Sequence, residues 1–213
     1  MKLYTYFRSS AAFRVRIALN FKGLAYETAF VHLARGEHRS PEYGAVNPQA
    51  LVPTLEEGGR RLTQSLAIIE YLEETHPKPP LLPPDSFGRA RVRSLAMLIA
   101  SEIHPVNNLR VLQHLKKTLG QNEDGVNAWY RHWIADGLAK FEADLANGKT
   151  TRKFCHGDAP TLADCCLVPQ IFNAQRYQCD TAPYPSAMRI FAECMKLDAF
   201  DRAQPSKQPD AEK

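Results

Sequence analysis

Residues 2–33 read KLYTYFRSSAAFRVRIALNFKGLAYETAFVHL, and the order of patterns within them decides the fold of the first part of the chain. Residues 2–7 and 26–33 are short apolar and aromatic runs of the kind found in β-strands. Between them, apolar side chains in residues 11–23 recur at helical spacing and end at Gly23, a common helix terminator. A strand, a helix and a strand in sequence predict a βαβ unit with parallel strands and a right-handed crossover.

The residues that follow extend this unit to a small α/β domain. A polar stretch at 36–46 predicts one short helix, and residues 52–65 predict two short strands around the turn Gly58–Gly59. A further helix is expected over residues 66–76, with Ser65 as its N-cap. The resulting order is β-α-β-α-β-β-α, which is an α/β arrangement.

A proline-rich stretch separates this domain from the rest of the chain. Five prolines between residues 77 and 84 remove amide donors and fix φ, so neither a helix nor a central strand can pass through them. Beyond them the pattern is helical, with a long helix over residues 86–119 that should kink at Pro105. We therefore predict an α/β domain over residues 1–80, a linker over 81–88 and an all-helical domain over 89–213.

Three more helices are expected in the second half, over residues 126–145, 161–177 and 186–197, from apolar positions three and four residues apart. The middle one begins with Thr161 and Asp164, which can form a capping box that serves folding rather than catalysis. The polar tail from Pro205 onward is expected to fray.

Composition and charge restrict the classes of function. The chain has 213 residues, 44% hydrophobic and 23% charged, and its net charge of +4 is too small to indicate nucleic-acid binding. No apolar stretch is long enough for a transmembrane helix, and the N-terminus does not resemble a signal peptide. The cysteines are odd in number and form no C-x-x-C pair, which favours reduced thiols in a cytoplasmic protein. They are Cys155, Cys165, Cys166, Cys179 and Cys194.

The first candidate for chemistry is the sequence Arg8-Ser9-Ser10, at the predicted junction of strand and helix. There the amides and the dipole of the helix favour an anion, and a serine hydroxyl can donate to a bound thiolate or carboxylate. A simpler interpretation is that one serine only caps the helix. The sequence leaves both interpretations open, and it does not decide which serine would be the donor.

The second candidate combines residues 47–55, NPQALVPTL, with Gln64 and Ser65. A cis peptide before Pro53 would expose the backbone of Val52 to an extended, peptide-like ligand. Gln64 and Ser65 place amides and a hydroxyl at another helix start, which suits a carboxylate. A turn proline and an ordinary N-cap would also explain these residues one by one. Only their occurrence together is evidence for a binding site.

The third candidate is a group of polar residues beside Pro105, midway along the long helix. Such residues cost free energy unless they are exposed or hydrogen-bonded, so a solvated helix face is the alternative interpretation. No partner stands at ligand spacing, and we predict no metal site. Arg176, on a later helix, carries no weight by itself. The polar residues are His104, Asn107, Asn108 and Arg110.

Together these stretches resemble the zeta class of glutathione transferases, the maleylacetoacetate and maleylpyruvate isomerases. The resemblance covers nearly the whole chain and is highly specific, because many motifs match in order. It implies a thioredoxin-like N-terminal domain, an all-helical C-terminal domain, glutathione as the cofactor, and a homodimer with the active site between the domains. The motifs are YFRSSAAFRVRIAL (6–19), NPQALVPTL (47–55), QSLAIIEYLEE (64–74), IHPVNNLRVL (103–112), TLADCCLVPQ (161–170) and QPD (208–210).

The resemblance also implies roles for individual residues. Ser9 matches the serine that hydrogen-bonds the glutathione thiolate, with Ser10 beside it. The backbone of Val52 matches the segment that pairs with the cysteinyl part of glutathione, and Gln64 and Ser65 match the residues that hold its γ-glutamyl end. Further positions that line the glutathione and substrate pocket are His38, His104, Asn108 and Arg110. The arginines expected to face substrate carboxylates are Arg8, which would also be catalytic, Arg110 and Arg176.

One position departs from the family pattern. Many zeta members have a cysteine after the two serines, whereas this chain has Ala11. A cysteine there is thought to assist isomerisation, so in this chain glutathione would have to supply the only sulfur nucleophile near the substrate.

The resemblance implies a glutathione-dependent cis–trans isomerase that acts on a small dicarboxylate. Addition of a thiolate to the cis double bond of maleylacetoacetate allows rotation, and elimination then gives fumarylacetoacetate, a step of tyrosine breakdown. The alternatives are a maleylpyruvate isomerase, a general glutathione transferase that acts on electrophiles, and a non-catalytic thioredoxin-like binding module. No nucleic-acid or membrane partner is expected.

Overall fold

The chain forms two compact units in the computed structural model, which describes residues 1–212. The first unit comprises Met1–Leu81 together with the chain from Met195 onward, and the second comprises Leu82–Cys194. Residues 195–212 were expected in the helical domain, but they belong to the first unit. Residues 77–85 between the units contain neither helix nor strand.

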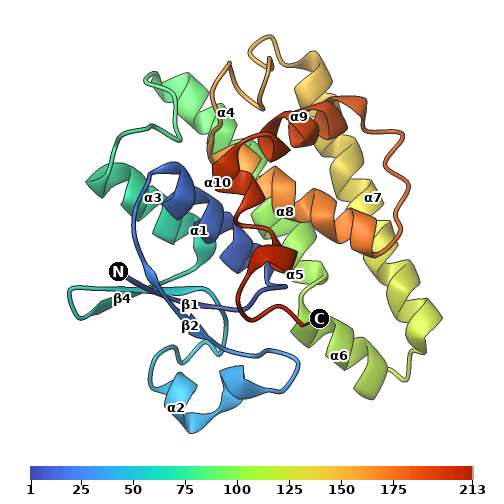
Figure 1. The fold of residues 1–213 in the computed structure, drawn as a ribbon. Coiled ribbons are helices and arrows are strands. Elements are labelled where there is room, and N and C mark those ends of the chain that lie inside the picture. The colour runs from blue at the N-terminus through green and yellow to red at the C-terminus, as the bar shows by residue number, and fades with distance from the viewer. Residues whose placement is uncertain (213) are drawn as a thin grey trace. The chain divides into compact units, whose positions relative to one another are not determined.

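The first unit is built on a four-stranded mixed sheet (Figure 1). Its strands are β1 (Lys2–Thr5), β2 (Glu27–Phe30), β3 (Thr54–Glu57) and β4 (Arg60–Thr63), in the spatial order β2-β1-β3-β4. β1 is parallel to β2, and β3 is antiparallel to both β1 and β4. The predicted βαβ unit and the hairpin at Gly58–Gly59 are therefore confirmed, and the α/β thioredoxin-like class of this unit with them.

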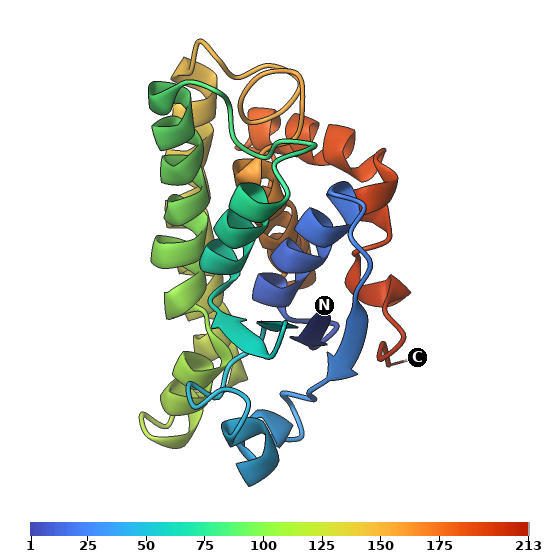
Figure 2. The same ribbon diagram turned by 90° about the vertical axis from the view of Figure 1, so that its left-hand side faces the viewer.

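Helices cover both faces of this sheet. Figures 1 and 2 show α1 (Ser10–Phe21) and α3 (Ser65–Thr75) on one face and the short α2 (Pro41–Gly44) on the other. α10 (Asp198–Asp201) packs against α1, and two short 3₁₀ turns are η1 (Glu37–Arg39) and η3 (Pro205–Lys207). The apolar core between sheet and helices includes Leu3, Val15, Ile17, Leu19, Leu55, Ile68, Ile69 and Leu72.

The first unit also buries several charged side chains. Lys22 Nζ lies 2.7 Å from Glu73 Oε2 and donates to the carbonyls of His76 and Pro79, which ties the end of α1 to the end of α3. Arg14 and Arg16 on α1 are 2% and 0% exposed. Arg14 donates to Ser65 Oγ and Arg16 to the carbonyls of Tyr6 and Phe7, so both belong to the internal contacts of this unit.

The second unit is helical throughout. Shorter helices lie between its long helices α4 and α7 (Figure 1), and α8 packs against α4. Leu167, Val168 and Ile171 of α8 are fully buried. No helix within residues 1–212 is both long and apolar enough to span a membrane. The helices are α4 (Ser86–Met97), the π-helical η2 (Leu98–Ile103), α5 (His104–Val106), α6 (Leu109–Lys117), α7 (Glu123–Asn147), α8 (Leu162–Arg176) and α9 (Pro185–Met195).

The long helix expected over residues 86–119 is interrupted differently from the prediction. Its middle is the π-helical stretch Leu98–Ile103, and the break follows at Asn107–Asn108. Pro105 lies in the short helix α5, which follows this π-helical stretch directly.

The C-terminal tail corrects another expectation, because it is packed rather than frayed. Asp210 accepts a hydrogen bond from the Phe7 amide over 2.9 Å, and Ala211 packs against the apolar side chains around Phe7. Glu212 contacts Arg8 and His32. A polar, proline-containing tail frays when its side chains have no partners in the fold, whereas the side chains of this tail have such partners.

Candidate active site

The turn between β1 and α1 carries the two serines. Ser9 is the N-cap of α1, and its Oγ accepts a hydrogen bond from the Ala12 amide over 3.2 Å. This contact uses the oxygen as acceptor and leaves the hydroxyl hydrogen for an anion. Ser9 is partly exposed, whereas Ser10 is the first helical residue and only 8% exposed. The geometry favours Ser9 over Ser10 as the donor, a choice that the sequence left open.

Three of the predicted segments lie at one end of the sheet. Tyr4 of β1 pairs with Thr54 of β3, which pairs in turn with Thr63 of β4. The last residues of β1 and β4 and the first residue of β3 therefore lie at the same end of the sheet. Strand pairing thus brings together segments that are far apart in the sequence. The segments that meet there contain Ser9 after β1, Val52 before β3 and Gln64 after β4.

The loop before β3 exposes a stretch of backbone. A cis peptide joins Val52 to Pro53, as predicted. Tyr43 Oη and Asn47 Nδ2 fix the loop by donating to the Leu51 carbonyl over 2.6 and 2.8 Å. Within residues 1–212, the amide and the carbonyl of Val52 form no hydrogen bond. They can therefore pair with an extended ligand, as a strand edge does.

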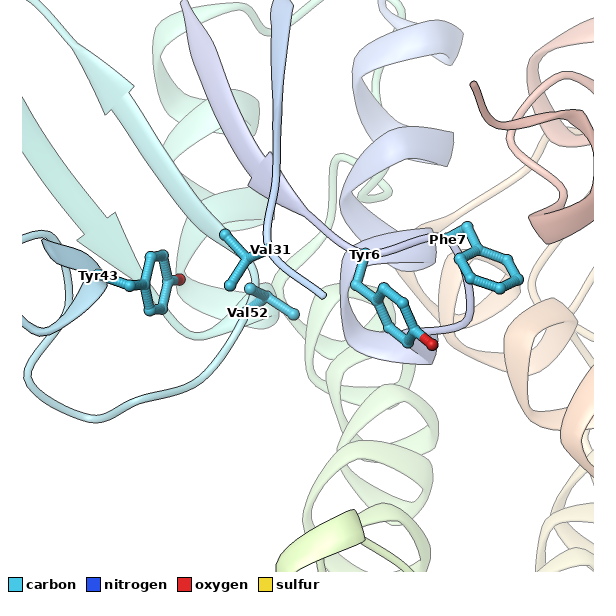
Figure 3. Close-up of a cluster of buried hydrophobic side chains, with 5 residues drawn as sticks. All are labelled: Tyr6, Phe7, Val31, Tyr43 and Val52. Atoms are coloured by element: carbon cyan, nitrogen blue, oxygen red, sulfur yellow. The ribbon is translucent and has the colours of Figure 1, made fainter. Parts of the chain in front are cut away.

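An apolar cluster supports both the serine turn and this loop. Figure 3 shows Val52 beside Val31 and near the ring of Tyr43, with Tyr6 and Phe7 on the turn that follows β1. All five side chains are at most 7% exposed. The two backbone segments are thus fixed by one set of contacts.

The start of α3 is arranged differently from the expected N-cap. Gln64, with φ of 69°, is the cap residue, and Ser65 is the first helical residue. Ser65 is buried, and its Oγ accepts a hydrogen bond from Arg14 Nη1 over 3.2 Å. The side chain of Gln64 is exposed and donates to Gln49 Oε1 over 2.8 Å. Amide and hydroxyl groups suited to a carboxylate are present at this helix start.

His38 lies in η1 and is 7% exposed. Its buried Nδ1 has no hydrogen-bond partner within residues 1–212. Burial lowers the pKa of His38, and the nearby positive charge of Arg39 lowers it further. The ring is therefore neutral at pH 7, with one polar atom that a ligand can satisfy.

Arg8 is exposed and forms an ion pair with Glu212 of the C-terminal tail. Its guanidinium also lies over the ring of Phe7, 4.8 Å from the centroid. A hydrogen bond from His32 and the charge of Arg8 lower the pKa of Glu212, so this carboxylate stays ionised well below neutral pH. Any anion bound by Arg8 has to share or replace the Glu212 contact.

In the second unit, the break between α5 and α6 carries three predicted residues. His104 starts α5 and is half-buried, and Asn108 caps α6 by accepting from the Arg110 amide over 3.2 Å. The Arg110 side chain is exposed. Helix α7 anchors this break, because Trp129 Nε1 donates to the Val106 carbonyl over 2.9 Å.

Arg176 is exposed at the end of α8 and is anchored to the same part of α7. Its guanidinium lies over the Tyr177 ring, 5.1 Å from the centroid, and that ring stacks on Tyr130 at 3.5 Å. Asn107 Nδ2 donates to the Tyr130 carbonyl over 3.2 Å. One short stretch of α7 thus positions both segments that hold the predicted arginines of this unit.

Comparison with known proteins identifies the family. Residues 1–74 match the model described as "Glutathione S-transferase, N-terminal domain". A maleylpyruvate isomerase from Ralstonia is 50% identical over 211 residues, which is 99% of this chain and 100% of that protein. A maleylacetoacetate isomerase from Rhizobium meliloti is 49% identical over 205 residues, which is 96% of each chain.

Solved structures agree over the full length. A zeta-class maleyl pyruvate isomerase in its holo form is 50% identical and has a TM-score of 0.98, with all of both chains covered. This chain belongs to the zeta class of glutathione transferases. A maleylacetoacetate isomerase from Methylobacterium extorquens, solved with bound malonate and glutathione, is 44% identical with a TM-score of 0.97, again with all of both chains covered.

Several groups of the N-terminal unit of this zeta-class chain match the chemical groups of glutathione. The start of α1 and the Ser9 hydroxyl suit a thiolate, because helix N-termini lower the pKa of thiols. The unpaired Val52 backbone suits a peptide, and the start of α3 suits a carboxylate. Within residues 1–212, no group of three or more His, Cys, Asp or Glu side chains is arranged to hold a metal.

None of the five cysteines of this zeta-class chain forms a disulfide, and four of them are buried. Burial raises the pKa of Cys155 and Cys194 well above the usual range, and it also raises the pKa of Cys179. These three thiols are therefore poor nucleophiles at neutral pH. Asp164, which forms the predicted capping box with Thr161, also accepts from the Cys155 amide over 2.9 Å.

Sequence reasoning missed several residues that shape the serine turn and the start of α3. Gln49 holds the Gln64 side chain, while Arg16 and Asp210 hold the backbone before Ser9. The QPD motif at 208–210 was a signal for Asp210, but its polarity suggested a frayed tail. No signal marked the contacts of Arg16 with this turn, since an arginine on an amphipathic helix is usually exposed.

Proposed function

We propose that this chain is a glutathione-dependent cis–trans isomerase that converts maleylacetoacetate to fumarylacetoacetate. The observation that carries the proposal is the partly exposed Ser9 hydroxyl at the N-terminus of α1, at the sheet end where the Val52 backbone is unpaired. The Rhizobium meliloti and Methylobacterium extorquens relatives are named for this activity, and the second was solved with glutathione beside a dicarboxylate, malonate.

We assign roles to the N-terminal residues, and their geometry supports this assignment. When bound, glutathione supplies a thiolate that adds reversibly to the conjugated double bond, which can then rotate. Ser9 donates a hydrogen bond to the sulfur and, with the first-turn amides of α1, favours the ionised thiol. Val52 pairs through its backbone with the cysteinyl part, and Gln64 and Ser65 hold the γ-glutamyl end. His38 contributes its unpaired Nδ1 to the ligand.

Arginines supply the charge that a substrate with two carboxylates requires. We assign Arg110 and Arg176 to these carboxylates, because both are exposed and rest on segments fixed by α7. Charge-assisted hydrogen bonds from arginine suit planar carboxylates better than those from other side chains. His104 and Asn108 line the same part of the chain, and Arg8 takes part when a substrate anion replaces Glu212.

Two further properties belong to this proposal. The protein is cytoplasmic, in keeping with five cysteines that form no disulfide, and it is a homodimer. Support for self-association comes from exposed apolar side chains on α4, where Phe87 and Met97 are 83% and 52% exposed. Sedimentation velocity tests the dimer, and Phe87→Glu should shift the protein toward monomer.

The test of the main proposal is an absorbance assay of maleylacetoacetate with and without glutathione. Turnover that requires glutathione supports the proposal, whereas absent or glutathione-independent turnover contradicts it. Turnover of an uncharged aryl halide in preference to the dicarboxylate would instead favour a general transferase. Failure to bind immobilised glutathione would favour a non-catalytic binding module.

Maleylpyruvate isomerase is the second candidate. It is favoured by the Ralstonia relative, which carries that name at 50% identity over its full length. The mechanism would be the same with a shorter keto acid. A comparison of kcat/KM for the two substrates decides between the candidates.

A further inference from the structure

The backbone that leads into Ser9 is held from two sides by charged groups. The Ser9 amide closes the turn by donating to the Tyr6 carbonyl over 3.0 Å. On one side, Arg16 donates to the carbonyls of Tyr6 and Phe7 over 3.3 and 3.1 Å. On the other side, Asp210 Oδ2 accepts from the Phe7 amide over 2.9 Å. Both peptide groups before Arg8 are therefore fixed by ionic side chains.

Arg16 is a fixed part of the fold. It is fully buried and also donates to Thr5 Oγ1 and the Ala203 carbonyl, each over 3.1 Å. Burial lowers the pKa of Arg16 to about 10, while the negative charge of Asp210 counteracts this effect, so Arg16 remains a cation at neutral pH. Its loss would disturb the core as well as the turn, which makes it a poor probe of the turn alone.

Asp210 reaches the turn from the far end of the chain on an ordered segment. Gln208 Nε2 donates to the carbonyls of Arg202 and Gln204, both over 2.8 Å, which holds the chain just before Asp210. Ala211, just after it, packs on the cluster that contains Phe7 (Figure 3). Asp210 is therefore presented to the Phe7 amide by its neighbours, and its second carboxylate oxygen has no hydrogen-bond partner within residues 1–212.

We propose that Asp210 is a positioning residue for thiol activation. Asp210 accepts a hydrogen bond from the Phe7 amide, while Arg16 holds the carbonyls of Tyr6 and Phe7. Together these contacts fix the turn, so that the Ser9 hydroxyl is positioned to donate to the glutathione sulfur. This inference rests on the proposed function in one respect, that the Ser9 hydroxyl acts on a bound thiol. Asp210 itself does not touch the substrate.

Three substitutions separate the acceptor role of Asp210 from its charge. Asp210→Ala removes the acceptor, Asp210→Asn keeps an acceptor oxygen at the same place without the charge, and Asp210→Glu keeps the charge but displaces the oxygen by one methylene. Asp198→Asn is the matched control, since Asp198 is an exposed carboxylate of the same segment that pairs with Arg202.

The readouts are the pKa of the bound glutathione thiol, from thiolate ultraviolet absorbance, and kcat with KM for glutathione. Asp210→Ala and Asp210→Glu should lower kcat about fivefold to tenfold, the contribution of one hydrogen bond, and raise the thiol pKa by up to about one unit. KM for glutathione should change little, because its binding groups lie elsewhere. Asp210→Asn should restore most of both values.

Two results would overturn the inference. One is an Asp210→Ala protein with wild-type kcat and thiol pKa; the other is impairment in Asp210→Asn with none in Asp210→Glu. The Asn and Glu pair keeps the test valid if the Ala variant does not fold. A wild-type protein that binds glutathione but does not isomerise contradicts the proposed function only, because the thiol titration still tests Asp210.

Discussion

The buried basic side chains of the N-terminal unit contrast with the exposed candidate arginines of the helical unit. In the N-terminal unit, Arg16, Lys22 and Glu73 are buried and hydrogen-bonded, and two of them hold backbone carbonyls. In the helical unit, the candidate arginines Arg110 and Arg176 are exposed and rest on segments fixed by α7.

This difference follows from what each unit has to do under the proposed function. Activation of a thiol needs a hydroxyl and amides at fixed positions, and buried ionic contacts supply that rigidity at a high desolvation cost. Binding of carboxylates needs positive charge that solvent and ligand can reach, and exposed arginines supply it. This explanation would be wrong if the buried charged side chains did not stabilise the N-terminal unit, or if the exposed arginines did not bind substrate.

The largest effect is expected from Glu73→Ala. It leaves the buried Lys22 ammonium without its carboxylate and the Leu81 amide without its acceptor, so the free energy of unfolding should fall by about 3–5 kcal/mol. Urea denaturation measures this. The control is Lys140→Ala, which breaks an exposed pair with Asp136 and should cost about 0.5 kcal/mol or less. Equal losses in the two variants would remove the contrast between buried and exposed charge.

The helical unit should be most sensitive to packing. A Cβ at Gly137 of α7 would lie 2.2 Å from Cγ1 of the buried Ile103, so Gly137→Ala should destabilise the protein by about 1–3 kcal/mol. Gly44→Ala is the matched control, because a Cβ there meets nothing within 4 Å. Thermal or urea unfolding compares the two, and an unchanged stability in Gly137→Ala would show that η2 and α7 can separate without cost.

The exposed arginines should affect substrate rather than glutathione. Arg110→Ala and Arg176→Ala should each lower kcat/KM for the dicarboxylate about tenfold, the contribution of one charge-assisted hydrogen bond, with KM for glutathione unchanged. Arg189→Ala, at an exposed position of α9, should have no effect. Steady-state kinetics with each substrate varied in turn provide the check. Loss of glutathione affinity in either variant would place that arginine in a different role.

The smallest effect concerns pH and His38. Because its pKa is lowered in the folded protein, the unfolded chain binds a proton first as the pH falls through the ordinary histidine range near about 6.5. The free energy of unfolding should therefore decrease as pH falls through this range, and the decrease should be smaller in His38→Gln. Urea denaturation at several pH values measures the slope. An identical slope in the variant would mean that His38 is not held neutral by burial.

Local patterns were sufficient to predict much of this molecule. The βαβ unit, the cis peptide before Pro53 and the capping box of Thr161 and Asp164 each depend on a few neighbouring residues, and all are present. The turn that holds Ser9 was also located, because a hydroxyl at a strand–helix junction has a recognisable spacing.

Contacts between distant residues were beyond such patterns. The hydrogen bond from Phe7 to Asp210 joins residues 203 apart; the QPD motif marked Asp210, but no local pattern pairs it with Phe7. The same holds for Ser65, which seemed a helix cap but accepts from the buried Arg14. Periodicity in the sequence indicates which side of a helix is apolar and therefore buried. An arginine can nevertheless be buried there when its N–H groups donate to backbone oxygens, and periodicity does not predict such a case.

The most direct test of the central claim is a titration of the glutathione thiol bound to the wild-type protein, Ser9→Ala and Ser10→Ala, followed by thiolate absorbance. The account predicts that the wild type ionises the thiol well below the ordinary thiol pKa of about 8.5, and that Ser9→Ala raises this pKa by about one to two units while Ser10→Ala leaves it nearly unchanged. A wild-type titration in Ser9→Ala, or a shift confined to Ser10→Ala, would contradict the assignment of Ser9 as the donor.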